Sequence, residues 1–432
     1  MMTDQDPVYD SGVSRRRLLG AAGVGALAIG SAAGYAASAA TGDGAASAAD
    51  PAAMPQAFEG KHQAGITTPA QDRLHLAVFD VGADSRDELV ALLKEWTEAA
   101  RKMCSGNDVG KYGAVAGPLE SPPEDTGEAL GLPPSGLTLT IGFGPTLFET
   151  KDGTDRFDLL DQRPQVLQDL PPFSGDRLRP EISGGDIVIQ ACANDPQVAV
   201  HAIRNLARIA FGRASIRYSQ LGFGRTSSTS KSQATPRNLF GFKDGTDNIK
   251  SEDETVVEEH VWVPEGGGST WMANGSYLVT RKIMMRIETW DRESLAGQEN
   301  IIGRAKGSGG PMSGGDEFET PRFSDKGAGG ELSIAEKSHV RLAHPTNNGG
   351  ARMLRRGYNF VEGSDGLGQL SAGLFFIAYQ NDPNKGFIPV QRSLSGLTND
   401  LLNEYIVHVS SGIFACPGGV SGTGYWGERL FG

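Results

Sequence analysis

The segment from Asn238 to Asn248, NLFGFKDGTDN, combines a carboxylate with residues that form turns. Asp-Gly is a strong turn signal, because glycine tolerates unusual backbone angles and aspartate bonds to nearby backbone amides. Apolar residues precede the turn, so the loop is entered from a hydrophobic stretch. Two interpretations follow. Asp244 either serves only the turn, or the turn presents its carboxylate to a reaction site.

A histidine and two arginines follow about a hundred residues later. His339 stands in SHVRLAHP and alternates with Val340 and Leu342, which predicts a strand or strand end that points the imidazole into an apolar cavity. A packed, hydrogen-bonded histidine is the alternative. Arg355 and Arg356 lie in MLRRGY. An inward-facing arginine needs an anionic partner, because guanidinium does not deprotonate in proteins. The other arginine is expected at the surface.

Several common kinds of site are not indicated. The seven histidines contain no His-x-x-x-His pair, and Cys104, Cys192 and Cys416 form no Cys-x-x-Cys, so a zinc hydrolase is not expected. No Gly-x-Ser-x-Gly elbow or Walker loop occurs, and the Gly-Phe-Gly at 222–224 lacks the third glycine of a dinucleotide fingerprint. Buried thiols are expected, and a single disulfide stays open.

The elements that must position these residues follow a repeated pattern. The first half predicts the order β-α-β-β-α-β, with strands at 74–81, 137–143, 186–192 and 215–218 and helices at 87–100 and 197–210. The second half repeats it in part, with strands at 276–288 and 373–379 and helices at 292–304 and 399–408. Two split β-α-β units imply two ferredoxin-like halves in an α+β protein. The glycine-rich stretches 265–268 and 307–330 predict long loops with a function.

Composition and charge narrow the class of protein. The chain has 432 residues, of which 38% are hydrophobic and 21% charged, which is typical of a soluble globular protein with two or three domains. The 59 glycines predict many turns. A formal net charge of −12 argues against a nucleic-acid partner and against strong binding to anionic lipid.

The N-terminus has the layout of an export signal. The basic segment SRRRLLG at 14–20 precedes an apolar run at 21–40, and Ala37-Ser-Ala39 is a plausible cleavage site. The paired arginines predict a twin-arginine signal at 1–39, followed by a flexible leader at 40–58. An uncleaved anchor is the alternative. We therefore expect the twin-arginine machinery to export the folded chain to a periplasmic, cell-envelope or secreted location.

In combination, these segments resemble the dye-decolorising peroxidases, in particular the exported class that includes the deferrochelatases. The resemblance spans residues 60–432 and rests on HQAGITTPAQ at 62–71, GFKDGTDN at 241–248, SHVRLAHP at 338–345, MLRRGY at 353–358, GLFFIAYQND at 373–382 and LNEYI at 402–406. It implies a dimeric-barrel-type haem peroxidase fold, with an N-terminal ferredoxin-like domain at 59–235 and a haem-binding one at 236–432.

The resemblance also implies a site for haem b. His339 corresponds to the axial ligand of the haem iron, and Asp244 and Arg355 correspond to the acid–base and cationic residues on the opposite face, where hydrogen peroxide binds. Glycine at 245 would let the backbone approach the porphyrin edge. Further haem contacts correspond to Gly245, Thr246, Asp247, Arg341, His344, Pro345, Thr346, Leu374 and Phe376.

Two assignments within this site stay open. The ligand histidine needs a carboxylate or carbonyl on its other ring nitrogen; Glu404 is the first candidate for that partner and Asp382 the second. His344 stands where the family often has asparagine, so it is an alternative ligand.

The implied function is an exported haem peroxidase that reduces hydrogen peroxide through a ferryl intermediate and oxidises dyes, phenolic compounds or other organic reductants. A deferrochelatase that releases iron from haem, and a non-catalytic haem carrier, are the alternatives; a carrier would not need Asp244 and Arg355. Iron-uptake partners and a homo-oligomer stay open. Aromatic residues that could pass electrons from large substrates, each with core packing as the alternative, are Trp262, Trp271, Trp290, Tyr358 and Tyr379.

Overall fold

The computed structural model describes residues 53–396 and 399–432. The signal predicted at 1–39 and the first part of the leader predicted at 40–58 lie outside these residues. Within them, no helix has both the length and the apolar character that a membrane span requires.

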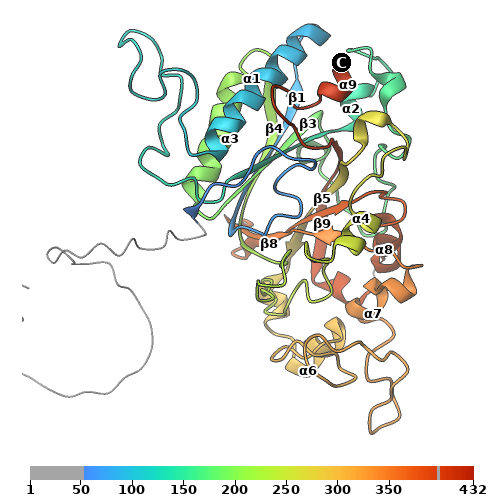
Figure 1. The fold of residues 1–432 in the computed structure, drawn as a ribbon. Helices are drawn as coiled ribbons and strands as arrows, with labels where there is room; N and C mark the ends of the chain where they lie inside the picture. Colours follow the sequence, from blue (N-terminus) through green and yellow to red (C-terminus); the bar gives the residue numbers. More distant parts are fainter. Residues whose placement is uncertain (1–52, 397–398) are drawn as a thin grey trace, which may run out of the picture. The chain divides into compact units, whose positions relative to one another are not determined.

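The first half of the described chain forms the predicted β-α-β-β-α-β unit. Its antiparallel strands stand in the order β2-β3-β1-β4. Helices α1 and α3 lie side by side over one face of this sheet (Figure 1). The elements are β1 (Arg73–Val81), α1 (Arg86–Cys104), β2 (Thr138–Phe143), β3 (Ile187–Ala193), α3 (Pro196–Ile209) and β4 (Ala214–Arg225).

Helix α1 forms where the sequence combines a cap with an apolar face. Ser85 caps the helix by accepting a hydrogen bond from the backbone amide of Glu88 (3.2 Å). The apolar side chains at helical spacing, Leu89, Leu92 and Trp96 among them, are fully buried against the sheet. The Trp96 indole donates to the backbone oxygen of Leu206 (2.7 Å), which joins α1 to α3.

The second half repeats the strand order of the first. Its strands stand in the order β9-β5-β8-β7, and the short β6 also pairs with β8. The elements are β5 (Ser276–Met285), α5 (Ile287–Trp290), α6 (Leu295–Ile302), α7 (His339–Ala343), β6 (Leu354–Arg355), β7 (Tyr358–Ser364), β8 (Leu370–Gln380), α8 (Phe387–Leu394) and β9 (Ile406–Cys416). Short helices outside the two units are α2 (Pro145–Phe148), α4 (Glu254–His260) and α9 (Glu428–Phe431).

Two short seams join the halves into one barrel-like sheet. Strands β2 and β9 pair through Phe143 and Ala415, and β4 pairs with β7 near Phe223 and Asn359. Because β5 also pairs with β8 along most of its length, the ring of strands closes. The two ferredoxin-like halves and the α+β class are therefore confirmed.

Two local predictions in the second half are wrong. Residues 399–408 do not form a helix: a single 3-10 turn, η6 (Leu401–Glu404), leads into β9, which pairs along the whole of β5. There, pairing with a distant strand overrides the local helical pattern. His339 begins helix α7 instead of lying on a strand. The helix expected at 292–304 is present with shorter bounds as α6, which Gly303 caps in the left-handed conformation (φ 89°).

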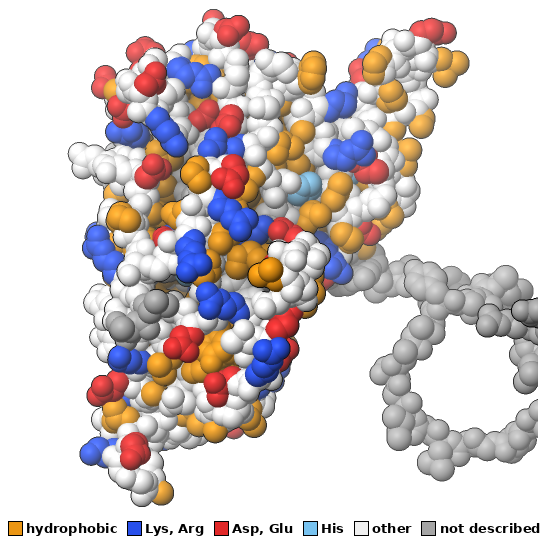
Figure 2. All heavy atoms as spheres, turned by 180° about the vertical axis from the view of Figure 1, so that it is seen from behind, with side chains coloured by type: hydrophobic (Ala, Val, Ile, Leu, Met, Phe, Trp, Pro, Cys, Tyr) orange, Lys and Arg blue, Asp and Glu red, His pale blue; other side chains and the backbone are white. Residues whose placement is uncertain are grey.

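The surface carries both signs of charge. Figure 2 shows Lys and Arg side chains interleaved with Asp and Glu over one face, with hydrophobic side chains in the hollows between them. All three cysteines are buried and unpaired, as expected for structural thiols.

The pairing of β5 with β8, which closes the ring of strands, can be tested by mutation. A Cβ at Gly373 in β8 would overlap the backbone oxygen of Ile283 in β5. We expect Gly373→Ala to lower the free energy of unfolding by about 1–3 kcal/mol, because the strands must separate to admit the methyl group. Denaturant unfolding measures this. Gly82→Ala is the control, because its Cβ would meet its nearest atom at an ordinary 3.7 Å. Equal stability of the two variants would contradict the close approach of β5 and β8 at Gly373.

Candidate active site

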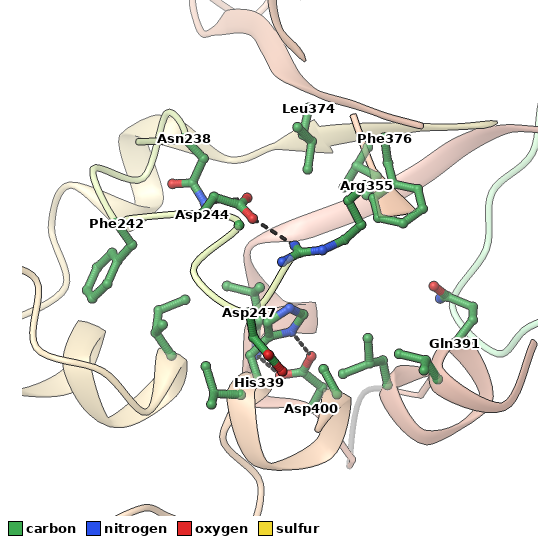
Figure 3. A pocket seen from close by; sticks show the side chains of 18 of the residues that line it. Asn238, Phe242, Asp244, Asp247, His339, Arg355, Leu374, Phe376, Gln391 and Asp400 are labelled. Atoms are coloured by element: carbon green, nitrogen blue, oxygen red, sulfur yellow. Dashed lines mark hydrogen bonds and ion pairs between the residues drawn. The ribbon is translucent and has the colours of Figure 1, made fainter. Parts of the chain in front are cut away.

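A cavity of about 260 Å³ lies in the second half of the chain. Side chains of β5, β8, α7 and α8 line it together with the loop at 238–249. Figure 3 shows Asp244 and Arg355 pointing toward each other, with His339 across from them and Asp400 beside it. The residues that the sequence places far apart are therefore brought to one cavity.

The loop at 238–248 directs the Asp244 carboxylate into this cavity. One carboxylate oxygen of Asp244 accepts from Arg355 Nη1 (2.8 Å) and the other from Asn238 Nδ2 (3.3 Å). Gly245 has φ +90°, and a Cβ there would approach the Cα of Ser227 to 2.9 Å, so the turn admits only glycine without strain. The turn itself is Gly245–Asn248, and the Asp244 carboxylate just before it bonds to side chains at the cavity and not to the backbone of the turn, which supports the second of the two interpretations.

Arg355 is held by its backbone as well as by its charge. Asn248, at the end of the same loop, accepts from the Arg355 backbone amide (2.7 Å) and donates to the Arg355 backbone oxygen (2.9 Å). The buried side-chain amide of Asn248 therefore fixes the short strand β6 beside the loop that carries Asp244. Sequence reasoning missed Asn248 as a positioning residue, although it lies within the motif.

The prediction that one arginine of the pair lies at the surface is wrong. Arg356, which directly follows β6, is fully buried, because its side chain lies on the opposite side of the extended chain from that of Arg355, in the barrel interior. There its guanidinium donates to Gln71 and to the backbone oxygen of Thr68.

His339 is oriented by a buried carboxylate. Its Nδ1 donates to Asp400 Oδ2 (2.6 Å), and the other oxygen of Asp400 accepts from the backbone amide of Leu402 (2.9 Å). Burial by itself lowers the pKa of His339, but the Asp400 carboxylate outweighs burial and raises the pKa above its ordinary value. With Nδ1 engaged, Nε2 of the neutral ring is available as a ligand atom.

The partner of His339 is therefore Asp400, and the prediction of Glu404 is corrected. Glu404 ends the turn η6 on its exposed side, whereas Asp400 caps the start of that turn and is buried beneath His339. The second candidate, Asp382, instead accepts from the backbone amide of Asn384 (2.9 Å). Because residues 399–408 were expected to be helical, the capping position of Asp400 was not recognised.

The remaining predicted contacts divide into those that reach the cavity and those that do not. Arg341 does not line it: its guanidinium donates to the backbone oxygens of Ile334 (2.9 Å) and Phe323 and lies over the Phe323 ring. Thr346 is likewise absent from the lining and bonds to the ring of His344 (2.8 Å). Predicted residues that do line the cavity are Gly245, Thr246, Asp247, His344, Pro345, Leu374 and Phe376.

His344 differs from His339 in its surroundings. Its Nδ1 is bonded to the neighbouring Thr346 hydroxyl, and burial lowers the pKa of the ring. Within the described part of the chain, no carboxylate is hydrogen-bonded to this ring, although the ligand role would favour one. Among the two histidines, the donor set thus supports His339 as the metal ligand.

The glycine-rich loop expected at 307–330 braces the Asp244 turn from outside. Glu317 forms an ion pair with Lys243 and accepts from the Thr246 hydroxyl (3.3 Å). Its backbone oxygen accepts from Arg304 Nη1 (2.8 Å). The long loop therefore supports the site through residues that flank Asp244.

The donor set fits a haem. An apolar cavity with one oriented imidazole suits an iron that is already held by a porphyrin, because one protein ligand completes such a site. A haem carries carboxylate groups that need cationic partners. The cavity is lined by four cationic side chains that the sequence did not indicate for this role: Lys243, Arg281, Arg304 and Arg352. Arg281 is the most buried of these, and its Nη1 has no hydrogen-bond partner among the described residues.

Comparison with known proteins gives consistent matches over most of the chain. The family models described as "Dyp-type peroxidase, N-terminal" and "Dyp-type peroxidase, C-terminal" match residues 63–224 and 235–421. A "Dye-decolorizing peroxidase" of Thermobifida fusca is 37% identical over 405 residues, covering 88% of this chain and 89% of the relative. A "Deferrochelatase" of Escherichia coli K12 is 36% identical over 381 residues, covering 87% of each.

Solved structures agree with these relatives. Ferric DtpA from Streptomyces lividans matches with a TM-score of 0.79 and 40% identity, over 88% of this chain and 98% of that one. A DyP-type peroxidase from Cellulomonas bogoriensis matches with a TM-score of 0.78 and 36% identity, over 89% and 99%.

Exchanging Asp400 for asparagine tests the orientation of His339. We expect Asp400→Asn to weaken haem binding by about tenfold or more, because the charged partner that fixes the ring is lost. Titration of the purified protein with haem, followed by absorption, measures the affinity. Glu404→Gln is the matched control and should bind haem as the parent does. The same loss in both variants, or in neither, would contradict the role assigned to Asp400.

Proposed function

Because this chain belongs to the Dyp-type peroxidase family, a family of haem-dependent enzymes, we propose that it reduces hydrogen peroxide beside the Asp244–Arg355 pair. The electrons for this reaction would come from dyes, phenolic compounds or similar reductants, which are oxidised. The observation that carries the proposal is the ion pair of 2.8 Å between these two side chains, on the opposite side of the cavity from His339. An acid–base group and a cation would thus stand across the cavity from an iron held by His339.

His339 would ligate the haem through Nε2. When bound, the haem supplies an iron centre that can be oxidised by peroxide and reduced again by electron donors. The hydrogen bond from Nδ1 to Asp400 gives the imidazole more anionic character and so makes it a stronger electron donor to a metal.

Asp244 would move the proton that peroxide cleavage requires. Hydrogen peroxide must lose a proton from one oxygen and gain a proton on the other before that second oxygen leaves as water. The Asp244 carboxylate lies at the cavity with one oxygen toward Arg355, and Asn238 holds the other oxygen only through a long bond of 3.3 Å. A carboxylate placed in this way can accept the first proton and return it to the departing oxygen.

Arg355 would stabilise the charge that develops during this cleavage. Its guanidinium keeps a positive charge at all relevant pH values, and the clamp from Asn248 fixes its backbone. A preorganised cation beside the departing oxygen lowers the barrier without a reorganisation cost. Leu374 and Phe376 lie on the same side of the cavity (Figure 3) and limit the space there to small molecules.

The carboxylate groups of the haem would need cationic partners, and Arg341, which was expected to contact the haem, is not available for this role. Arg341 is turned away from the cavity, whereas Arg304 and Arg352 line it. Arg352 also pairs with Asp247 (3.1 Å), so this pair would have to rearrange or share its charge with the haem. We assign Arg304 and Arg352 to this role in place of Arg341.

Iron release from haem is the second candidate function. It is favoured by the similarity to proteins named deferrochelatase, which are as similar as the one named dye-decolorizing peroxidase. The third alternative, a protein that only carries haem, is not favoured, because it would not need the pair of Asp244 and Arg355. Iron-free porphyrin, detected by its fluorescence during incubation with haem, would support the release reaction over peroxidase activity.

Substitution of Asp244 and of Arg355 tests the peroxidase proposal. We expect Asp244→Asn to slow the reaction with hydrogen peroxide by about 10²–10⁴-fold, because the proton carrier is lost. Arg355→Leu should slow it by about 10²–10³-fold through loss of the fixed cation. Stopped-flow absorption of the haem protein after mixing with peroxide measures both rates. The control is Asp253→Asn, an aspartate that pairs with Lys231 and does not line the cavity. Unchanged rates in both Asp244→Asn and Arg355→Leu would refute the roles of Asp244 and Arg355.

We also propose export by the twin-arginine route, which rests on the sequence alone. Replacement of Arg15 and Arg16 by lysine should retain the protein in the cytoplasm, because the paired arginines are the recognised feature. Fractionation and immunoblotting check this. Efficient export of the double variant would contradict the proposal.

A further inference from the structure

The imidazole of His344, which lines the cavity, is held in its uncharged form by the turn that follows it. Its Nδ1 accepts a hydrogen bond from the Thr346 backbone amide (3.3 Å) and so caps the 3-10 turn η5 (Pro345–Asn347). A backbone N–H can only donate, so Nδ1 carries no proton and the single ring proton is on Nε2. The Thr346 hydroxyl lies 2.8 Å from the same Nδ1.

Charged side chains from three other segments act on this ring. Among the described residues these are Asp247 from the loop at 238–249, Arg352 from the segment before β6, and Arg304, which follows the cap of α6. All three line the cavity. Asp247 and Arg352 form an ion pair of 3.1 Å, and their side chains are 49% and 36% exposed, so this pair lies where the cavity reaches solvent.

The balance of these charges keeps the ring neutral. Burial lowers the pKa of His344, the Asp247 carboxylate opposes burial, and Arg352 and Arg304 lower the pKa again. As long as Arg352 neutralises Asp247, a proton on the ring brings little electrostatic gain. The charge state of His344 therefore depends on where Arg352 is engaged.

A ligand with carboxylate groups changes this balance. Arg352 cannot give its whole guanidinium to a new carboxylate while it is paired with Asp247. If Arg352 turns to the ligand, Asp247 loses its cation, and further negative charge enters the same end of the cavity. Added anions favour the charged form of a nearby imidazole.

Thr346 allows His344 to gain a proton without leaving its place. A protonated Nδ1 can no longer accept from the Thr346 amide, so the long bond of 3.3 Å is lost. The shorter contact of 2.8 Å is kept, because a hydroxyl can accept as well as donate and only has to rotate. Asparagine, which the family often has at this position, would also cap the turn but has no proton to gain.

We propose that His344 takes up one proton when Arg352 turns from Asp247 to a carboxylate of the porphyrin. The inference rests on the proposed function, because it is the haem that brings these carboxylates. The proton comes from solvent at the exposed end of the cavity and binds to Nδ1. The imidazolium then supplies the positive charge that Asp247 has lost, so that both Asp247 and the ligand are neutralised.

Proton uptake by His344 makes the affinity for the porphyrin rise as the pH falls. The pKa of His344 lies below its ordinary value in the free chain and is higher in the complex. The gain in affinity is therefore complete below the free value and disappears as the pH rises through the bound value. His339 acts in the opposite direction, because its pKa is raised and the ring must be neutral to ligate iron.

Iron-free protoporphyrin IX separates the two histidines, because it carries the same carboxylates and needs no ligand from His339. Its binding to the purified haem-free chain is followed by porphyrin fluorescence at about pH 6 and about pH 8. Relative to His344→Asn, which keeps a cap for η5, we expect the parent to gain about tenfold in affinity from the higher to the lower pH. Aggregation of the free porphyrin affects both proteins equally and cancels in this comparison.

Two further variants test the partners of His344. Asp247→Asn should remove the pH dependence, and adding His344→Asn to it should change nothing more, because the proton serves Asp247. Thr346→Val should weaken the pH dependence, since the protonated ring loses its acceptor. His62→Asn is the control and should behave as the parent, because His62 is another half-buried histidine, stacked on Trp262 and outside the cavity lining.

The dimethyl ester of protoporphyrin IX, which has no charged carboxylate, should bind without the pH dependence that His344 causes. The same pH dependence in His344→Asn as in the parent, or with the ester as with the free acid, would overturn the inference and leave the peroxidase proposal standing. A parent that shows the coupling but whose haem form does not react with peroxide would overturn only the proposed function. A parent that binds neither haem nor the porphyrin would overturn both.

Discussion

The ion pair between Asp244 and Arg355 is the interaction on which the site depends, because it joins two segments 111 residues apart across one cavity. Neither segment can hold it alone. The Asp244 turn requires glycine at 245 and the brace from Glu317, while Arg355 requires the short strand β6 and the clamp from Asn248. A charged pair that is partly removed from water is useful only when its geometry is fixed in this way.

The opposite side of the cavity follows the same physical rule. There the imidazole of His339 is oriented by Asp400, whose second oxygen is engaged by the backbone of η6. On both sides a carboxylate holds the neighbouring side chain, and a backbone amide or a side-chain amide holds the carboxylate. The two sides differ in what they present: one presents the guanidinium of Arg355, and the other presents the imidazole of His339.

The barrel separates the site from the rest of the molecule. Arg355, the last residue of β6, faces the cavity and the next residue, Arg356, faces the barrel interior, so one segment contributes to a polar site and to a sealed core. The same separation distinguishes the aromatic residues. Tyr358 and Tyr379 are enclosed with Arg356, whereas Trp290 and Tyr405 lie between the cavity and Glu293. The change from the turn η6 to strand β9 places Tyr405 there.

The β-α-β-β-α-β order of the first half, the turn that follows Asp244, and the choice of His339 and Arg355 as candidates for one site could be predicted from the sequence, because periodicity, turn chemistry and the family resemblance are local or linear properties. Three features became visible only in the folded chain: Asp400 and not Glu404 bonds to His339, Arg341 turns away from the cavity, and Asn248 clamps Arg355. These outcomes depend on strand pairing between distant segments: residues 406–416 became β9 because β5 offered a partner along its whole length. A hydrogen bond across such a distance leaves no periodic trace in the chain.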